Sequence, residues 1–143
     1  MSLVNGSFEQ DYLGWNRSGN QDVVTGAATQ GVKAARFNAA QKPPNAVLTQ
    51  SFSTTPGRSY TLSFDYGVFS PVSQRQQRLQ VTLQGQKSLL SQLITQSAFG
   101  SNVQYSPKVF SFTADSTLTT LTFTDASLIT DSVDSWIDNV QLK

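Results

Sequence analysis

The amino-acid sequence predicts an all-β protein, a two-sheet antiparallel β-sandwich or jelly roll. Apolar and polar residues alternate with a period of two in several short runs, which is typical of strands that bury one face. Clusters of Gly and Pro separate these runs, and no long window carries the i, i+3, i+4, i+7 apolar repeat of a helix. The length of 143 residues suits a single domain with one core. Helical content is therefore expected to be near zero.

The clearest strand is the run RSYTLSFDYGVF at residues 58–69. Its first face carries Tyr60, Leu62, Phe64, Tyr66 and Val68, and its second carries Thr61, Ser63, Asp65, Gly67 and Phe69. The first face is expected to pack in the core and the second to be polar up to Phe69.

The same alternation predicts strands at 78–86, 108–114 and 118–126. Shorter strands are expected at 3–9, 21–25, 33–38, 46–53, 89–95 and 135–142. The segment 54–59, TTPGRS, is predicted to be a tight turn that joins two paired strands. Two stretches, 70–77 and 96–107, lack alternation and are predicted to be long loops, where binding residues are often found.

Composition excludes several classes of function. The chain has no Cys and no His, which removes thiolate and imidazole catalysis, disulfides and zinc or haem ligation. Any bound metal should therefore be a hard cation such as calcium or magnesium, held by oxygen atoms. The net charge is +1 and only 13% of the residues are charged, so nucleic acid and anionic membrane surfaces are not expected partners.

No apolar run approaches the length of a membrane span, so membrane insertion is not expected. The start Met1-Ser2-Leu3 is similar to an expression leader, and the chain ends one residue after its last predicted strand. We therefore expect residues 1–143 to be a single domain excised from a larger protein, and a monomer within it.

The order of motifs along the chain resembles a known family. The motifs are LVNGSFE with a following GW, then GVKAARF at 31–37, LTQSFSTTPGRSYTLSFDYG at 48–67, KVFSFTADSTLTTLTFTD at 108–125 and SWIDNVQL at 135–142. Together they resemble the carbohydrate-binding modules of the galactose-binding-like jelly-roll superfamily, particularly those associated with xylanases and glucanases. The resemblance implies two antiparallel sheets in which the first and last strands pair.

The resemblance also implies a structural calcium beside the paired end strands. The matching carboxylates are Glu9, just after the first predicted strand, and Asp138, in the last. Main-chain carbonyl groups around Gln30 to Lys33 would complete the ligand set. An alternative is that Glu9 and Asp138 are solvated edge charges or a capping pair. A glycosidase pair is disfavoured, because positions at strand ends among apolar neighbours suit a closed metal site better than an open cleft.

A glycan site needs an aromatic ring for stacking and polar groups that bond neighbouring hydroxyls. On the polar side of the concave sheet or in the two long loops, the candidates are Asp65, Phe69, Arg75, Arg78, Gln80, Gln84, Phe99 and Tyr105. Each could equally be an ordinary solvated sheet residue. Trp15 is expected in the core and Trp136 in the core or at its rim, because buried sandwich aromatics are commoner than exposed platforms.

The sequence thus predicts a calcium-stabilised carbohydrate-binding module of a secreted or cell-surface bacterial protein, with no catalytic activity of its own. The main alternative is a structural or adhesive β-sandwich that has lost the sugar site.

Overall fold

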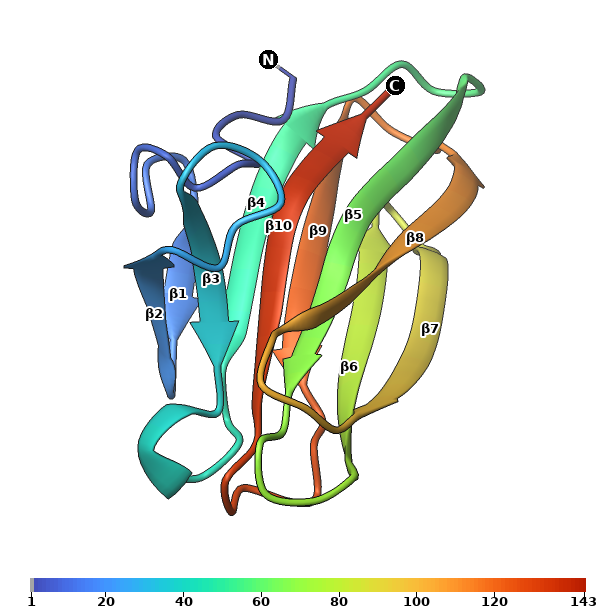
Figure 1. Ribbon diagram of the computed structural model, residues 1–143. Coiled ribbons are helices and arrows are strands. Elements are labelled where there is room, and N and C mark those ends of the chain that lie inside the picture. The colour runs from blue at the N-terminus through green and yellow to red at the C-terminus, as the bar shows by residue number, and fades with distance from the viewer. Residues whose placement is uncertain (1) are drawn as a thin grey trace.

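A computed structural model of the chain describes residues 2–143 as two five-stranded antiparallel sheets that pack face to face (Figure 1). Sheet A is ordered β1 (Asn16–Ser18), β4 (Val47–Ser53), β9 (Leu118–Asp125), β6 (Arg75–Gln84) and β7 (Ser88–Ala98). Sheet B is ordered β2 (Gln21–Thr25), β3 (Lys33–Phe37), β10 (Asp134–Leu142), β5 (Ser59–Phe69) and β8 (Gln104–Thr113). A short 3₁₀ helix, η1 (Ala39–Gln41), follows β3. The predicted jelly-roll β-sandwich is confirmed. The part of the chain described contains no helix long and apolar enough to span a membrane.

The core lies between the inward faces of the two sheets. In β5 the side chains of Leu62, Phe64, Tyr66 and Val68 are buried, as the alternation predicts. The ring of Phe64 meets that of Phe123 from β9 edge-on, with the ring centroids 4.9 Å apart, so this pair joins the two sheets directly. Outward-facing side chains of the same strands are then free to build surface sites.

The N-terminal segment 3–9, predicted to be a strand, forms consecutive turns instead. Asn5, Phe8 and Asp11 adopt positive φ angles of 50°, 57° and 54°, which are incompatible with an extended strand. The side-chain amide of Asn5 donates to the carbonyl groups of Asp11 and Leu13 and holds this coil together. The expected pairing of first and last strands is therefore wrong. The segment contacts β10 through a bond from the Val140 amide to the Gly6 carbonyl instead, at 2.9 Å.

Two further expectations about connections are corrected by the topology. The turn at 54–59 does not join paired strands, because β4 belongs to sheet A and β5 to sheet B. The two predicted long loops are also shorter than expected, since β6 begins at Arg75 and the β7–β8 connection spans only 99–103. Strands β7 and β8 lie at sheet edges, where many side chains are exposed on both faces, so the burial alternation that marks central strands is weak there.

Candidate functional site

The outer face of sheet B carries one row of side chains that crosses all five strands. Register places Asp22, Arg36, Trp136, Gly67 and Tyr105 opposite one another in β2, β3, β10, β5 and β8. Because directly paired residues in a sheet project to the same side, these positions form a continuous strip. The strip changes from charged at β2 and β3 to aromatic at β10 and β8.

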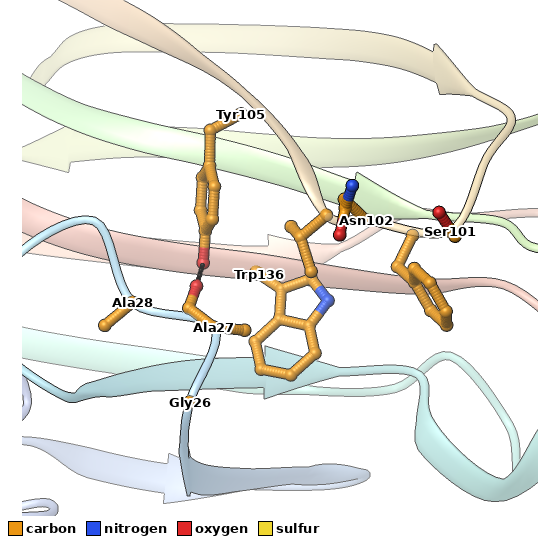
Figure 2. Close-up of a pocket in the computed structure, with 9 residues that line it drawn as sticks. Gly26, Ala27, Ala28, Ser101, Asn102, Tyr105 and Trp136 are labelled. Carbon is orange, nitrogen blue, oxygen red and sulfur yellow. Dashed lines mark hydrogen bonds between the residues drawn. The ribbon is translucent and has the colours of Figure 1, made fainter.

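Gly67 creates space in the middle of this row. A Cβ atom at Gly67 would lie 2.8 Å from the ring of Tyr105 and 2.6 Å from a methyl group of Val103. Both side chains therefore occupy the volume that any larger residue would need. The Tyr105 ring extends across the sheet, and its hydroxyl donates to the Ala27 carbonyl of the β2–β3 loop at 2.6 Å (Figure 2).

These features bound a cleft of about 440 Å³ on sheet B. Its lining consists of Gly26, Ala27, Ala28, Phe69, Ser101, Asn102, Val103, Tyr105 and Trp136. In Figure 2 the indole of Trp136 lies between the β2–β3 loop on one side and the residues of the β7–β8 loop on the other. The cleft thus has an aromatic base, two loop walls and no charged side chain in its lining.

Trp136 is held firmly at the base of the cleft. Its side chain is only 7% exposed, and the guanidinium of Arg36 lies over the indole at 5.7 Å from the ring centroid. Arg36 is fixed in turn by a two-pronged ion pair with Asp22, with N–O distances of 3.0 and 2.6 Å. The indole N–H has no hydrogen-bond partner within the described part of the protein, and in Figure 2 it points toward the side of Ser101 and Asn102.

The β2–β3 loop, one wall of the cleft, is attached to the sheet by carboxylates. Asp138, which is fully buried, accepts main-chain N–H bonds from Thr29 and Gln30 at 2.8 and 2.9 Å. Its neighbour across β5, Asp65, accepts a bond from the Thr29 hydroxyl at 2.7 Å. Burial raises the pKa of Asp138, although its main-chain N–H donors act in the opposite direction.

The phenol of Tyr105 strengthens the same attachment. Burial raises the pKa of Tyr105, and the negative charges of Asp138 and Asp65 raise it further. The phenol therefore stays protonated at physiological pH and keeps donating to Ala27. The wall and the base of the cleft are thus connected through one hydrogen-bonded system.

The two carboxylates predicted to hold calcium both bind the β2–β3 loop. Glu9 accepts the main-chain N–H groups of Val32 and Lys33 at 2.9 and 2.7 Å, and its negative charge contributes to the raised pKa of Asp138. Of Lys33, only the carbonyl oxygen could serve a metal, because its ammonium has no lone pair to donate; that ammonium pairs with Asp11 at 2.8 Å. Within residues 2–143 no cluster of three or more Asp, Glu, His or Cys side chains is placed to hold a metal.

Calcium nevertheless fits the chemical class of these groups. A carboxylate oxygen that accepts one N–H bond still has a free lone pair, and carboxylate and carbonyl oxygens are the ligands that calcium prefers. The N–H donors of the loop also offset the carboxylate charges without a cation. The calcium site therefore stays a prediction.

The structure divides the predicted glycan-binding residues between opposite surfaces. Phe69 and Tyr105 line the cleft. Asp65 is on the same face but is engaged with the β2–β3 loop. Arg78, Gln80 and Gln84 project from β6 onto the outer face of sheet A, opposite the cleft. The eight residues therefore cannot form a single site on one sheet.

The remaining two candidates lie at strand ends: Arg75 is the first residue of β6, and Phe99 directly follows β7. Arg75 donates to the Ser73 hydroxyl and lies 3.8 Å from an oxygen of Asp131. Phe99, at 58% exposure, begins the β7–β8 connection but is not part of the lining. Neither side chain reaches the cleft.

Two features of the cleft were missed from the sequence. Trp136 was expected in the core or at its rim, and it is buried as expected, but its ring also forms the base of the cleft. The signal was present in the alternation of β10, since Trp136 and Asp138 share the phase that points away from the buried Ile137. Gly67 could not be singled out, because its role depends on the position of the Tyr105 ring.

A sequence-family model described as protein of unknown function (DUF642) matches residues 10–143. The chain belongs to the DUF642 family. No curated protein sequence matches this DUF642 chain.

Solved structures similar to the DUF642 chain include carbohydrate-binding modules. TmCBM61, solved in complex with β-1,4-galactotriose, has a TM-score of 0.72 and 16% identity over 99% of this chain and 96% of that one. A family 16 carbohydrate-binding module has a TM-score of 0.60 and 22% identity, covering 100% and 99%. The K1 cleaved adhesin domain of Lys-gingipain from Porphyromonas gingivalis has a TM-score of 0.66 and 13% identity, covering 91% and 90%. At these identities the likeness establishes the shared fold.

Proposed function

We propose that this DUF642 domain binds a glycan in the cleft on sheet B and has no catalytic role. The observation that carries the proposal is the placement of Trp136 at the base of an open cleft, with Tyr105 and Phe69 in the same lining. Sugar rings bind aromatic rings through their apolar C–H faces. The solved carbohydrate-binding modules that share the fold support the same class of ligand.

The size and lining of the cleft suit a saccharide of modest length. Its volume of about 440 Å³ lies in the range of small-molecule sites, roughly 300–1,000 Å³. The Ser101 hydroxyl and the Asn102 amide line one wall and can form hydrogen bonds with sugar hydroxyls. Affinity is expected to be modest, because desolvation of hydroxyl groups offsets much of the hydrogen bonding.

The carboxylates near the cleft support a binding role over hydrolysis. Glycoside hydrolysis uses two carboxyl groups that flank the scissile bond. No carboxylate is part of the cleft lining, and Asp65 and Asp138 on the same face bind the β2–β3 loop. We propose that the domain serves as a monomeric module of a larger secreted or cell-surface bacterial protein.

A binding panel tests the proposed function directly. Affinity electrophoresis and isothermal titration calorimetry with xylan, β-glucan, mannan and galactan should detect at least one ligand with a Kd in the micromolar to millimolar range. A glycan array extends the search to shorter oligosaccharides. If none binds, with or without calcium, the chain is better described as a structural or adhesive sandwich.

We also propose a structural calcium at Glu9 and Asp138, on the chemistry of the donor groups and the family resemblance. Saturating calcium should raise the melting temperature by several degrees over a chelated sample, since a ligand that binds only the folded state stabilises it. Glu9→Gln should abolish the difference, whereas Asp115→Asn, which alters a carboxylate in the connection 114–117 between β8 and β9, should preserve it. Identical melting curves with calcium and with chelator would refute the metal site.

A further inference from the structure

Asp134 lies beside the cleft, although its side chain is not part of the lining. It is the directly paired neighbour of Phe69 across the β10–β5 ladder, and it precedes Trp136 by two residues in the same strand. Side chains two residues apart in a strand share a face, and directly paired Cβ atoms lie about 4.5–5.5 Å apart. Asp134 is therefore adjacent to two of the three aromatic residues of the cleft.

The carboxylate of Asp134 has no bonding partner in the described part of the protein. No group there donates a hydrogen bond to it, and no cation forms an ion pair with it. This distinguishes it from Asp138, whose oxygens accept main-chain bonds from Thr29, Gln30 and Asn139. The oxygens of Asp134 are not among the buried unpaired atoms, so water reaches them and the hydroxyl groups of a ligand can replace that water.

The charged residues on the neighbouring strands do not bind the Asp134 carboxylate, so it can bind a ligand. Arg36 of β3 is the cation whose charge acts on Asp134, but its Nε and Nη2 atoms donate to Asp22 of β2, and it forms no ion pair with Asp134 among the described residues. The only charged residue of β5, the other neighbour of β10, is Asp65, which belongs to the loop attachment at the opposite side of the Trp136 row. Burial raises the pKa of Asp134 to about 6; the charge of Arg36 opposes this shift and that of Asp22 adds to it.

We propose that Asp134 determines ligand specificity in the cleft by accepting hydrogen bonds from neighbouring hydroxyl groups of a neutral saccharide stacked on Trp136. This inference rests on the proposed glycan-binding function and names its ligand class. A carboxylate accepts two hydroxyl protons at once, which matches a pair of adjacent hydroxyls on a sugar ring. Proximity to the negative charge of Asp134 disfavours uronic acids, because the two carboxylates repel each other.

The test uses calorimetry at pH 7.5 and pH 5 with the tightest neutral binder from xylan, β-glucan, mannan and galactan, and with polygalacturonate as the anionic probe. Asp134→Asn keeps the size of the side chain and removes its charge. At pH 7.5 it should weaken binding about tenfold or more, since hydrogen bonds to a charged group are strong. Wild-type affinity should fall at pH 5, where Asp134 is mostly protonated, and the variant should show no such fall.

Asp131→Asn is the matched control. Asp131 precedes β10, is exposed and faces Arg75, so its variant should bind like the wild type at both pH values. A thermal melt separates ligand binding from folding. Because the folded-state pKa of Asp134 is raised, its protonated form contributes stability that is lost as the pH rises through about 6. Asp134→Asn should therefore melt no earlier than the wild type at pH 7.5.

The outcomes separate this inference from the proposed function. Wild-type binding with an unaffected Asp134→Asn variant would overturn the role of Asp134 and leave glycan binding intact. Preferential binding of polygalacturonate over every neutral polysaccharide would overturn the neutral ligand class. Failure of the wild type to bind any saccharide would overturn both the proposed function and the inference that rests on it.

Discussion

Trp136→Ala is expected to weaken glycan binding about 30-fold or more while the sandwich stays folded. The indole forms the base of the cleft, and its removal eliminates the stacking surface between Tyr105 and Phe69. Buried aromatic contacts of this kind are typical hot spots, where truncation costs 2 kcal/mol or more, roughly a 30-fold loss of affinity. Trp136 lies outside the core cluster between the sheets, so the loss of stability should stay near 1–3 kcal/mol, roughly a fifth of a typical total.

Titration calorimetry and thermal melting measure the two effects on the same sample. Trp136→Phe should retain part of the affinity, because it keeps a ring and loses the indole N–H. Val109→Ala is the control, since Val109 projects from β8 on the same face, is 63% exposed and lies outside the cleft. Unchanged binding by Trp136→Ala would place the glycan elsewhere, for example on the polar outer face of sheet A.

Gly67→Val should abolish binding, by filling the cleft from within. Its new Cβ would lie within 3 Å of Val103 and of the Tyr105 ring. Neither position can be kept, so the Tyr105 ring must move and its bond to Ala27 should break. Overpacking of this kind costs about 1–3 kcal/mol. The backbone itself poses no obstacle, because Gly67 lies in an extended strand where valine is favourable.

Ser63→Val provides the matched control for this substitution. Ser63 projects from the same face of β5 and pairs with Val109, away from the cleft. It should bind glycan like the wild type, whereas Gly67→Val should lose binding and show altered tyrosine fluorescence or NMR signals for Tyr105. Normal affinity in Gly67→Val would mean that the position of the Tyr105 ring does not matter for the ligand.

The strongest parts of the fold prediction came from central strands. In β5, one face must enter the core and the other must meet solvent, so the period-two pattern of Leu62, Phe64 and Tyr66 is a direct consequence of burial. Edge strands lack this constraint. In β7, apolar side chains such as Leu93, which is 43% exposed, also occur on the outer face. The alternation is therefore weak in this strand, and its last residues, 96–98, were predicted to belong to a loop.

The N-terminal segment was misjudged for a different reason. Its apolar residues suggested a strand, but Phe8 and Trp15 reach the core from a coil whose turns depend on hydrogen bonds of Asn5. Such side-chain to main-chain bonds compete locally with strand formation. The resulting contact of the two rings, with centroids 5.3 Å apart, fills the core as a strand residue would.

The sequence by itself determined the fold class and the phase of the central strands. It also lacks Cys and His, which restricts any metal ligands to oxygen atoms. It also identified Phe69 and Tyr105, two rings of the cleft. The tertiary structure alone decided which outward faces coincide. Alternation shows that Asp65, Arg78 and Trp136 point away from the core, but only strand order and register place Trp136 beside Gly67 and Tyr105 and put Arg78 on the opposite sheet. A binding site depends on these long-range pairings, whereas the hydrophobic pattern of each strand is local.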